Sequence, residues 1–248
     1  MAFTNRKILI TGGNSGIGLA LAEALQAKGN RIIITGRNPQ SLQAALDRNP
    51  EMAGYPLDVT DAAALAAFPA QLLAEHADLD AVILNAGIME AEDYTADTVS
   101  TDVADRTIAT NLTAPIHLAA ALLPHLRSRP EAALLTVSSG LAFVPRAQNP
   151  VYSATKAAIH SWSQGLRHQL KDTSVRVHEI APPLVATELT PGQSKAPMAL
   201  PLDAFIAEVV QILSQDRVPD EILVERVAFQ RNAEREGRYE STFTAING

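Results

Sequence analysis

Short runs rich in β-branched residues alternate along this chain with longer stretches rich in alanine and leucine. Such alternation predicts βαβ units, because two parallel strands need a crossover connection that is usually a helix. We expect strands over residues 7–11, 31–35, 54–57, 81–85, 132–138, 175–180 and 222–224. We expect helices over residues 16–28, 39–48, 61–75, 101–126, 151–172 and 201–215. The pattern therefore predicts an α/β fold, with a doubly wound parallel sheet and helices on both faces.

The composition fits one such domain over residues 1–248 and excludes several other classes of protein. Hydrophobic residues make up 47% of the chain, which is enough for a sizeable core, and the net charge of −7 lacks the basic excess typical of nucleic-acid binders. Apolar runs are shorter than the roughly 18 residues that a membrane span needs. The first residues run directly into a strand, so we expect no secretory signal and a cytoplasmic location. The absence of cysteine excludes disulfides and thiolate metal sites.

A glycine-rich turn, Thr11-Gly-Gly-Asn-Ser-Gly-Ile-Gly18, joins the first strand to the first helix. Gly12 permits the tight turn, Gly16 lets the backbone approach a pyrophosphate, and Gly18 lets the helix pack on the strand. The free N–H groups and the dipole of the helix N-terminus favour anions. The spacing differs from the Gly-x-Gly-x-x-Gly of many dehydrogenases, and a purely structural turn is the alternative. Its place between a strand and a helix favours a dinucleotide-binding turn.

The end of the second strand indicates which dinucleotide would bind. NAD enzymes usually place Asp or Glu there, on the ribose hydroxyls. Here Gly36 leaves room, and Arg37 can pair bidentately with a 2′-phosphate. We therefore predict NADP(H) rather than NAD(H), against the alternative of a surface arginine. Asp58, after the third strand, either meets the adenine or belongs to the N-terminal region of the next helix.

Tyr152 and Lys156 are four residues apart at the start of a predicted helix, so their side chains share one face. An ammonium beside a phenol favours the phenolate, which makes the tyrosine a better acid–base catalyst. Alone, such a pair could be a surface contact. Ser139 lies just past the fifth strand, at the same sheet edge as the cofactor, and we prefer it to its neighbour Ser138 as the third member of the site.

Together, the glycine turn, the segment Asn85-Ala-Gly87, Asn111, Ser139 and the segment YSATK that begins at Tyr152 resemble the short-chain dehydrogenase/reductase family. The match runs in order from about residue 5 to about residue 190. The resemblance implies a Rossmann-type sheet of seven parallel strands. It also implies a cofactor half over roughly residues 1–130 and a catalytic and substrate half over roughly residues 131–248.

The resemblance further implies a role for each site residue. Tyr152 would be the general acid/base, Ser139 would hold the substrate oxygen, and Asn111 would complete a proton relay. Lys156 would bind the nicotinamide ribose and lower the pKa of the tyrosine. The cofactor-binding residues that the family motifs imply are Gly12, Asn14, Ser15, Gly16, Ile17, Gly18, Arg37, Asp58, Val59, Asn85, Ala86, Gly87, Tyr152, Lys156, Pro182, Val185 and Thr187.

The segment Ala181-Pro-Pro-Leu-Val-Ala-Thr187 departs from the family pattern. The family usually has Pro-Gly at this point, followed by Val and Thr that contact the nicotinamide amide. Here Pro183 replaces the glycine, while Val185 and Thr187 remain. With the segment VSSGLAF, these residues resemble a branch of the family named after an oxidoreductase of D-alanine–lipoteichoic acid operons, a name that identifies no substrate.

Pro115 bears on Asn111 through the backbone. Proline has no N–H, so the carbonyl of Asn111, four residues earlier, loses its usual helical donor. We expect this carbonyl to hold a water that reaches Lys156 and supplies Tyr152 with protons. A helix kink that serves packing alone is the alternative.

Three further features have weaker signals. Residues 184–200, between the sixth strand and the next helix, are expected to form a lid over the ligand. The charged tail, residues 226–248, is expected to be a surface extension or an oligomer arm. Four histidines, spaced too widely to bind one metal, are expected at helix surfaces or an interface: His117, His125, His160 and His168.

We predict an NADP(H)-dependent oxidoreductase that acts on a small-molecule carbonyl or alcohol, without a metal, and that forms a homodimer or homotetramer as its family does. Apolar residues flank the site segments and indicate a substrate with a nonpolar portion: Ile88, Met89, Leu141 and Phe143. One alternative is a non-catalytic NADP(H) sensor, which would be expected to lack Tyr152 or Lys156. Another is a lyase or isomerase of the same fold, for which the glycine turn would be expected to be lost.

Overall fold

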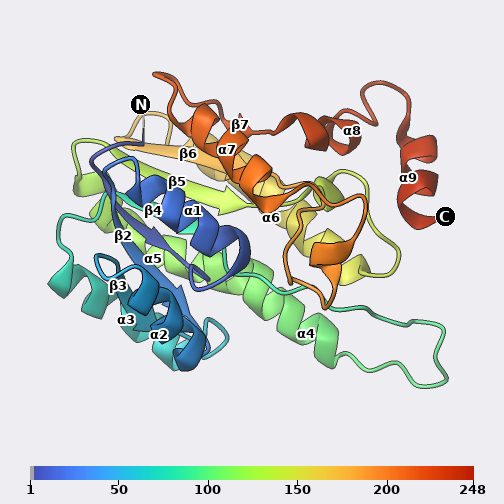
Figure 1. The fold of residues 1–248 in the computed structure, drawn as a ribbon, viewed down its shortest axis with the longest axis horizontal. Helices are drawn as coiled ribbons and strands as arrows, with labels where there is room; N and C mark the ends of the chain where they lie inside the picture. The colour runs from blue at the N-terminus through green and yellow to red at the C-terminus, as the bar shows by residue number, and fades with distance from the viewer. Residues whose placement is uncertain (1–2) are drawn as a thin grey trace.

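Seven strands form one parallel sheet in the order β3-β2-β1-β4-β5-β6-β7, and helices connect consecutive strands (Figure 1). The computed structural model describes residues 3–248. The strands are β1 (Lys7–Ile10), β2 (Arg31–Gly36), β3 (Ala53–Pro56), β4 (Ala81–Leu84), β5 (Ala132–Val137), β6 (Val175–Ile180) and β7 (Glu221–Ile222). The helices are α1 (Gly16–Gln26), α2 (Pro39–Arg48), α3 (Ala62–Glu75), α4 (Asp102–Ile108), α5 (Ala114–Ser128), α6 (Pro150–Gln169), α7 (Leu202–Leu213), α8 (Ala228–Arg231) and α9 (Tyr239–Asn247). The doubly wound α/β fold is confirmed.

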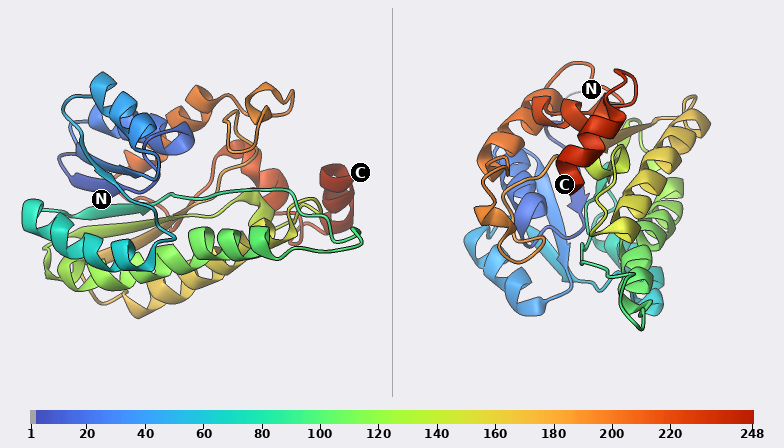
Figure 2. Two further views of the ribbon diagram at one scale, coloured as in Figure 1. Left: turned by 90° about the horizontal axis from the view of Figure 1, so that it is seen from below. Right: turned by 90° about the vertical axis from the view of Figure 1, so that its right-hand side faces the viewer.

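The sheet separates two layers of helices, as both views in Figure 2 show. Helices α1, α2 and α7 pack on one face, and α3, α5 and α6 pack on the other. Within β1, Ile8 and Ile10 point toward the first layer and Leu9 points toward the second. Because both faces are covered, the strands read as continuous apolar runs rather than as alternating polar and apolar residues.

The order of the strands reverses between β1 and β4. Strand β1 pairs with both β2 and β4, and the chain leaves β1 toward one edge of the sheet and β4 toward the other. A crevice therefore opens outside the carboxyl ends of these two strands, which is where open α/β sheets bind ligands. The glycine turn and the segment after β4 both end at this crevice.

The single helix expected over residues 101–126 is wrong in one respect. Helices α4 and α5 are separated by a π-helical turn, Ala109–Thr113, in which the N–H of Ala114 donates to the carbonyl of Ala109. Pro115 follows directly and cannot donate a helical hydrogen bond, so the wider turn accommodates the missing donor. Asn111 lies inside this turn. Because apolar periodicity indicates only regular α-helix, it did not predict the π-helical turn.

Residues 226–248 lie at the surface as expected, because most of their side chains are exposed or half-buried. A role of this segment as an oligomer arm stays a prediction. After β7 the chain forms α8 and α9, and Val227, Ala233 and Thr242 are buried. Asn247 in α9 accepts a hydrogen bond from the N–H of Ala147 at 2.6 Å and donates to the carbonyl of Pro145 at 3.1 Å. The tail therefore packs against the loop between β5 and α6 of its own chain.

Residues 184–200 form the expected irregular segment, and its two ends meet. Val185 pairs with Leu200 in an isolated bridge, and the N–H of Leu200 donates to the carbonyl of Leu184 at 2.8 Å. The loop is thus closed at its base. Its mobility and its closure over a ligand stay predictions.

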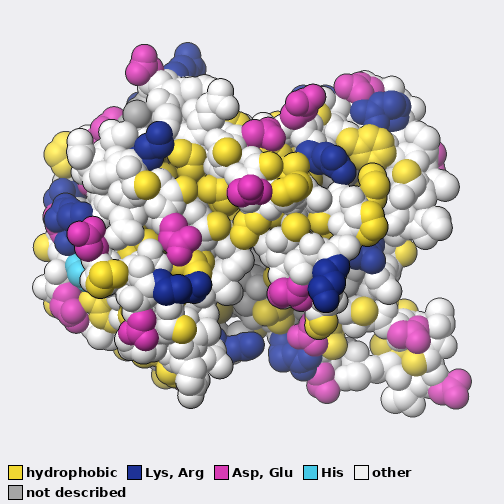
Figure 3. All heavy atoms as spheres, viewed as in Figure 1, with side chains coloured by type: hydrophobic (Ala, Val, Ile, Leu, Met, Phe, Trp, Pro, Cys, Tyr) yellow, Lys and Arg dark blue, Asp and Glu magenta, His cyan; other side chains and the backbone are white. Residues whose placement is uncertain are grey.

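The surface shows mixed charges on the face drawn in Figure 3, where Lys and Arg side chains are interspersed with Asp and Glu side chains. Apolar side chains gather near the middle of that face. Among residues 3–248, no helix combines the length and the apolar character needed to cross a membrane.

Candidate active site

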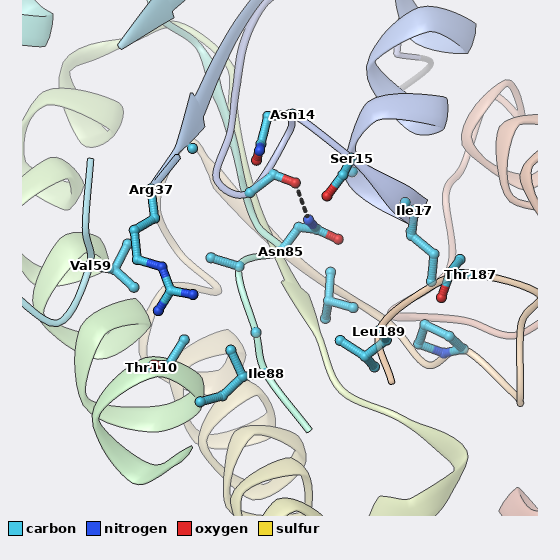
Figure 4. A pocket seen from close by; sticks show the side chains of 18 of the residues that line it. Asn14, Ser15, Ile17, Arg37, Val59, Asn85, Ile88, Thr110, Thr187 and Leu189 are labelled. Carbon is cyan, nitrogen blue, oxygen red and sulfur yellow. Dashed lines mark hydrogen bonds between the residues drawn. The ribbon is translucent and has the colours of Figure 1, made fainter. Parts of the chain in front are cut away.

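A pocket of about 410 Å³ lies at the carboxyl ends of β1, β2, β4 and β5. All cofactor-binding residues named from the sequence line it, and so do Ser139, Tyr152 and Lys156. Figure 4 shows Arg37 and Val59 at one end of the pocket and Thr187 and Leu189 at the other. The structure thus brings residues from seven separate segments of the chain into one elongated cavity.

The glycine turn forms one wall of the pocket. Gly12 and Gly16 have φ angles of 63° and 53°, a region of backbone conformation that favours glycine. A Cβ on Gly18 would overlap both the Gly12 carbonyl oxygen and the Asn85 side chain, so α1 can approach β1 only with glycine there. Ser15 precedes the first residue of α1, so its hydroxyl stands beside the free N–H groups of the helix.

Thr11 ties this turn to the segment after β4, and the sequence analysis missed its role. Its hydroxyl accepts hydrogen bonds from the N–H groups of Asn85 and Ala86 at 3.0 and 3.1 Å. In return, the Asn85 amide donates to the carbonyls of Thr11 and Gly12 at 2.9 and 3.2 Å (Figure 4). The sequence signal for this link is a hydroxyl residue at the end of a strand, which is too common to single out.

The end of β2 forms the second wall. A Cβ on Gly36 would lie 2.5 Å from Cγ of Asn14, so a larger residue would displace the Asn14 side chain. Asn14 is itself held by a 2.7 Å hydrogen bond to the hydroxyl of Ser41. Arg37 extends beside Asp58, and the hydrogen bonds from Thr60 together with the Arg37 charge outweigh burial and hold the pKa of Asp58 below its usual value. The N-cap of α3 is Asp61, so the helix does not need Asp58 for capping.

Ser139, Tyr152 and Lys156 lie together at the opposite end of the cavity. Tyr152 and Lys156 are buried on the same face of α6, with exposed fractions of 6% and 4%. Nζ of Lys156 donates to the carbonyl of Val137 at 2.8 Å and lies 5.5 Å from the centre of the Tyr152 ring. Ser139 lies two residues past the end of β5, so the strand end and the helix bring the three side chains to the same end of the cavity.

Burial controls the acidity of both titratable groups. It raises the pKa of Tyr152 to about 12, against a hydrogen bond from Ser139 that acts in the lowering direction. It lowers the pKa of Lys156 to about 8. The hydrogen bond from Ser139 is the interaction that favours the phenolate here. The expected lowering of the tyrosine pKa by Lys156 stays a prediction.

The two neighbouring serines differ in what their hydroxyls contact. The Ser138 hydroxyl donates to the carboxylate of Glu179, on the helix-covered side of β6. The Ser139 hydroxyl accepts the N–H of Leu141 at 3.1 Å and bonds to Tyr152. The geometry thus favours Ser139 over Ser138 as the residue that faces a substrate.

Asn111 lies behind the pocket wall rather than in it. Its side chain accepts the N–H of Ile88 and donates to the carbonyl of Ile88, both at 2.9 Å. A Cβ on Gly87 would lie 3.3 Å from Oδ1 of Asn111 and 3.6 Å from Nζ of Lys156. Asn111 therefore fixes the backbone that passes beside Lys156. The role of its main-chain carbonyl in a water relay stays a prediction.

The segment after β6 completes the pocket despite the substitution of proline for glycine. Pro182 accepts the N–H of Gly140 at 2.8 Å, and Pro183, Val185 and Thr187 line the cavity. The sequence analysis missed Gln193, whose buried amide donates to the Val185 carbonyl at 2.9 Å and to the Thr187 hydroxyl at 3.3 Å. That amide fixes the two residues that the family pattern assigns to the nicotinamide end.

The histidines divide into two groups. His117 and His168 are exposed, as expected. His160 is not a simple surface residue, because its Nδ1 bonds to the buried Glu179 carboxylate at 2.8 Å. His160 is half-buried, and its partner lies 19 residues away in the sequence and could not be inferred from helical spacing. His125 is also half-buried, and its Nε2 bonds to the Leu79 carbonyl at 2.9 Å. An interface position stays a prediction for these histidines.

Comparison with known proteins agrees with this architecture. The family model described as short chain dehydrogenase matches residues 6–197. The chain is 41% identical over 250 residues to the uncharacterized oxidoreductase DltE of Bacillus subtilis, covering 100% of this chain and 98% of that protein. A short-chain dehydrogenase from Burkholderia cenocepacia in complex with NADP has a TM-score of 0.82 at 21% identity, covering 99% of both chains. One from Burkholderia phymatum in complex with NAD has a TM-score of 0.81 at 18% identity, covering 97% of this chain and 96% of that one.

Proposed function

The chain belongs to the short-chain dehydrogenase family of oxidoreductases, and from this premise we propose that it is an NADP(H)-dependent enzyme that interconverts a carbonyl and an alcohol on a small molecule. The observation that carries the proposal is the meeting of Ser139, Tyr152 and Lys156 at one end of a cavity whose other end holds Arg37. The distance between these ends suits an elongated dinucleotide, with its reactive ring beside the tyrosine.

The residues present fit such a cofactor. Glycine at position 18 lets α1 approach β1 closely, and glycine at position 36 accommodates the Asn14 side chain, so the glycine turn and the end of β2 both line the pocket. The N-terminus of α1 and the Ser15 hydroxyl would hold the pyrophosphate, and Arg37 would hold a 2′-phosphate. When bound, NADPH would supply the hydride.

In the reducing direction, the chain's own residues manage the substrate oxygen and its proton. The Ser139 hydroxyl would donate a hydrogen bond to the carbonyl oxygen as negative charge develops there. Tyr152, whose pKa is raised to about 12, keeps its proton at neutral pH and would donate it to that oxygen. Lys156, with a pKa of about 8, is cationic at pH 7 and would stabilise the phenolate that remains.

The preference for NADP(H) rests on Arg37. We expect Arg37→Ala to weaken NADPH binding by about 1.5–3 kcal/mol, or roughly tenfold to 150-fold, because one charge-assisted phosphate contact is lost. NADH binding should change by less than about twofold, since NADH has no such phosphate. Fluorescence titration with both cofactors measures the two dissociation constants.

Arg48→Ala is the matched control, because Arg48 is an exposed arginine on α2 that donates to the Ala44 carbonyl and does not line the pocket. It should leave both constants unchanged. An unaltered ratio of NADPH to NADH affinity in Arg37→Ala would contradict the assignment. Oxidation of NADPH with panels of ketones, aldehydes, quinones and imines then separates a reductase from a protein that binds the cofactor without turnover.

A further inference from the structure

A carboxylate is buried where the fold would otherwise place an apolar side chain. Val175, Val177 and Glu179 alternate along β6 on the face that α5 and α6 cover, and Glu179 is fully buried. Its carboxylate accepts a hydrogen bond from the Ser138 hydroxyl and one from Nδ1 of His160 at 2.8 Å. Burying a carboxylate is costly unless it is well paired, so both donors matter to the position it takes.

The two donors come from the two elements that carry the catalytic side chains. Ser138 directly precedes Ser139, and His160 continues the series Tyr152, Lys156 at four-residue spacing on one face of α6. The Glu179 carboxylate therefore joins the end of β5 to the catalytic face of α6. Neither donor is itself placed to touch a substrate oxygen in the way that Ser139 is.

Three consecutive residues at the end of β5 each contact this helix face. The Val137 carbonyl accepts Nζ of Lys156 at 2.8 Å. Ser138 reaches His160 through Glu179, and Ser139 bonds to Tyr152. The register between the strand end and the helix is thus fixed at two further points next to the Ser139–Tyr152 pair.

The His160 ring is fixed by its other contacts as well. The amide of Gln164 donates to its Nε2 at 3.1 Å, which leaves Nδ1 as the nitrogen that donates to Glu179. Phe143, in the loop that follows Ser139, packs its ring edge-on against His160 with centroids 4.8 Å apart. The guanidinium of Arg231 lies over the Phe143 ring, with its Cζ 4.7 Å from the ring centroid. We call the link that Glu179 makes between Ser138 and His160 the bridge. Through Phe143, the bridge also orients the loop beside the substrate end of the pocket.

We propose that Glu179, with Ser138 and His160, is a positioning residue that sets the separation between the Ser139 and Tyr152 hydroxyls. The proposal rests on the function proposed above, because it concerns the geometry of that reaction. Glu179 touches neither the cofactor wall nor the glycine turn. Its loss should therefore slow the chemical step and leave cofactor binding almost unchanged.

Ser138→Ala and Glu179→Gln test the proposal. Ser138→Ala removes the hydrogen bond from Ser138 to Glu179. Glu179→Gln leaves one acceptor oxygen for two donors, so one of the two hydrogen bonds is lost. A displacement of about 1 Å at a catalytic group can cost roughly 100-fold in rate. We expect kcat to fall roughly tenfold to 100-fold, KM for the carbonyl to change less, and the NADPH dissociation constant to stay within about twofold.

Ser163→Ala is the matched control. Ser163 is a buried serine on α6 whose hydroxyl bonds to Thr136 of β5 at 2.7 Å, so the variant deletes a similar bond between the same two elements, away from the catalytic pair. It should leave kcat within about twofold. An equal loss of kcat in Ser163→Ala would show that any weakening of this interface slows the enzyme, and would overturn the specific role of Glu179.

Hydrogen exchange supplies a readout that does not need turnover. Ser138→Ala and Glu179→Gln should speed exchange at the amides of residues 140–144, while Ser163→Ala should not. If neither the unaltered protein nor Tyr152→Phe oxidises NADPH, the proposed function is wrong. Hydrogen exchange alone then tests whether the bridge holds residues 140–144 in place. Unchanged exchange at residues 140–144, or unchanged kcat in an active enzyme, overturns the inference; if Glu179→Gln does not fold, Ser138→Ala gives the same decision.

Discussion

The two ends of the pocket are built from different parts of the polypeptide. At the glycine turn the surface is mainly backbone, shaped by Gly12, Gly16 and Gly18 and held by hydrogen bonds that Thr11 and Asn85 make. At the other end the surface consists of buried polar side chains on β5 and α6. Backbone N–H groups bind an anion without changing protonation, whereas the second end must hold and release a proton.

This difference has an energetic consequence. The glycine end tolerates little added volume but buries no titratable group. The catalytic end buries Tyr152 and Lys156, and burial moves the pKa of each away from its usual value. A protein gives up stability to keep such groups in a dry site. Mutations at the two ends should therefore separate cofactor affinity, catalysis and stability.

The sharpest separation is expected at Tyr152. Tyr152→Phe removes the only atom that would deliver the proton, so turnover should fall by about 10³-fold or more, while NADPH affinity changes by less than about twofold. Ser139→Ala should cost roughly 10²–10³-fold, since it removes one hydrogen bond to developing charge. Steady-state kinetics and cofactor titration measure the two effects.

If Tyr152→Phe lowered NADPH affinity as much as turnover, the two ends of the pocket would not have separate roles in binding and catalysis. Ser138→Ala gives the internal standard for Ser139, because the two serines are adjacent and differ in the partner of the hydroxyl. If Ser138→Ala were the more damaging change, Ser138 rather than Ser139 would face the substrate.

The opposite pattern is expected at Gly18. A Cβ there would overlap the Gly12 carbonyl oxygen, so Gly18→Ala must displace the turn, at a cost of about 1–3 kcal/mol. NADPH affinity should fall about tenfold or more, with kcat at saturating cofactor much less affected. Gly165→Ala, in α6, is the control, because a Cβ at Gly165 meets nothing within 4 Å.

Gly165→Ala should be neutral or stabilising by about 0.5–1 kcal/mol, as expected for an exposed helical position. Isothermal titration and urea unfolding on both variants measure affinity and stability. Normal NADPH affinity in Gly18→Ala would mean that the turn adapts, and that its backbone geometry is not what binds the cofactor.

A smaller effect, on stability, is expected at Lys156. Burial lowers its pKa from 10.5 to about 8, so the folded state holds fewer protons than the unfolded state between these values. Below pH 8, folding therefore carries a cost of about 3 kcal/mol, which shrinks as the pH rises toward 10.5. Lys156→Met removes this cost and loses a hydrogen bond worth about 1 kcal/mol.

We expect Lys156→Met to be inactive and about 2 kcal/mol more stable than the unaltered protein at pH 7, with the advantage lost near pH 10.5. Tyr152, with its pKa raised to about 12, destabilises both proteins alike above pH 10, so it cancels in the difference. Urea unfolding at several pH values checks this. A variant that is less stable at pH 7 would show that burying the ammonium costs little.

The smallest effect is expected in the loop of residues 184–200, which borders the end of the pocket opposite Arg37. Its base is closed by the bridge between Val185 and Leu200, so only the exposed middle can change with ligand. NADPH should slow hydrogen exchange several-fold at residues 188–197 and leave β5 unchanged. Equal, strong protection with and without NADPH would identify a static loop.

The two ends also differ in how far the sequence predicts them. Glycine spacing and the position of Arg37 led to the cofactor wall, because local backbone demands leave a local sequence signal. The spacing of Tyr152 and Lys156 predicted that they share a helix face, and the resemblance of the combined motifs to the family indicated their role. Glu179 and His160 were not, because their pairing depends on how β6 and α6 pack, and a buried carboxylate at a core position has no periodic signature.

The same limit applies to Thr11 and the tail. Each acts through hydrogen bonds to segments distant in the chain, from Thr11 to Asn85 and from Asn247 to Ala147. Gln193 differs, because it bonds to Val185 and Thr187 within its own irregular loop, which has no periodic signal. The interruption of the long helix could be anticipated at Pro115, but its form, a π-helical turn, depends on the fit of α4 and α5 against α6. Short-range chemistry was therefore predictable, and long-range pairing was not.

The contact between Asn247 and Ala147 has a consequence for the order of events during synthesis. Asn247 is made 100 residues after Ala147, a delay of roughly 5 to 20 seconds at ordinary rates of translation. The hydrogen bonds of the glycine turn involve residues no later than Ala86, so that wall can assemble while the remainder of the chain is still being made. The loop between Ser139 and Tyr152 gains its final clamp only at the end. The wall at the glycine turn would thus form before the loop beside Ser139 and Tyr152 is held in place.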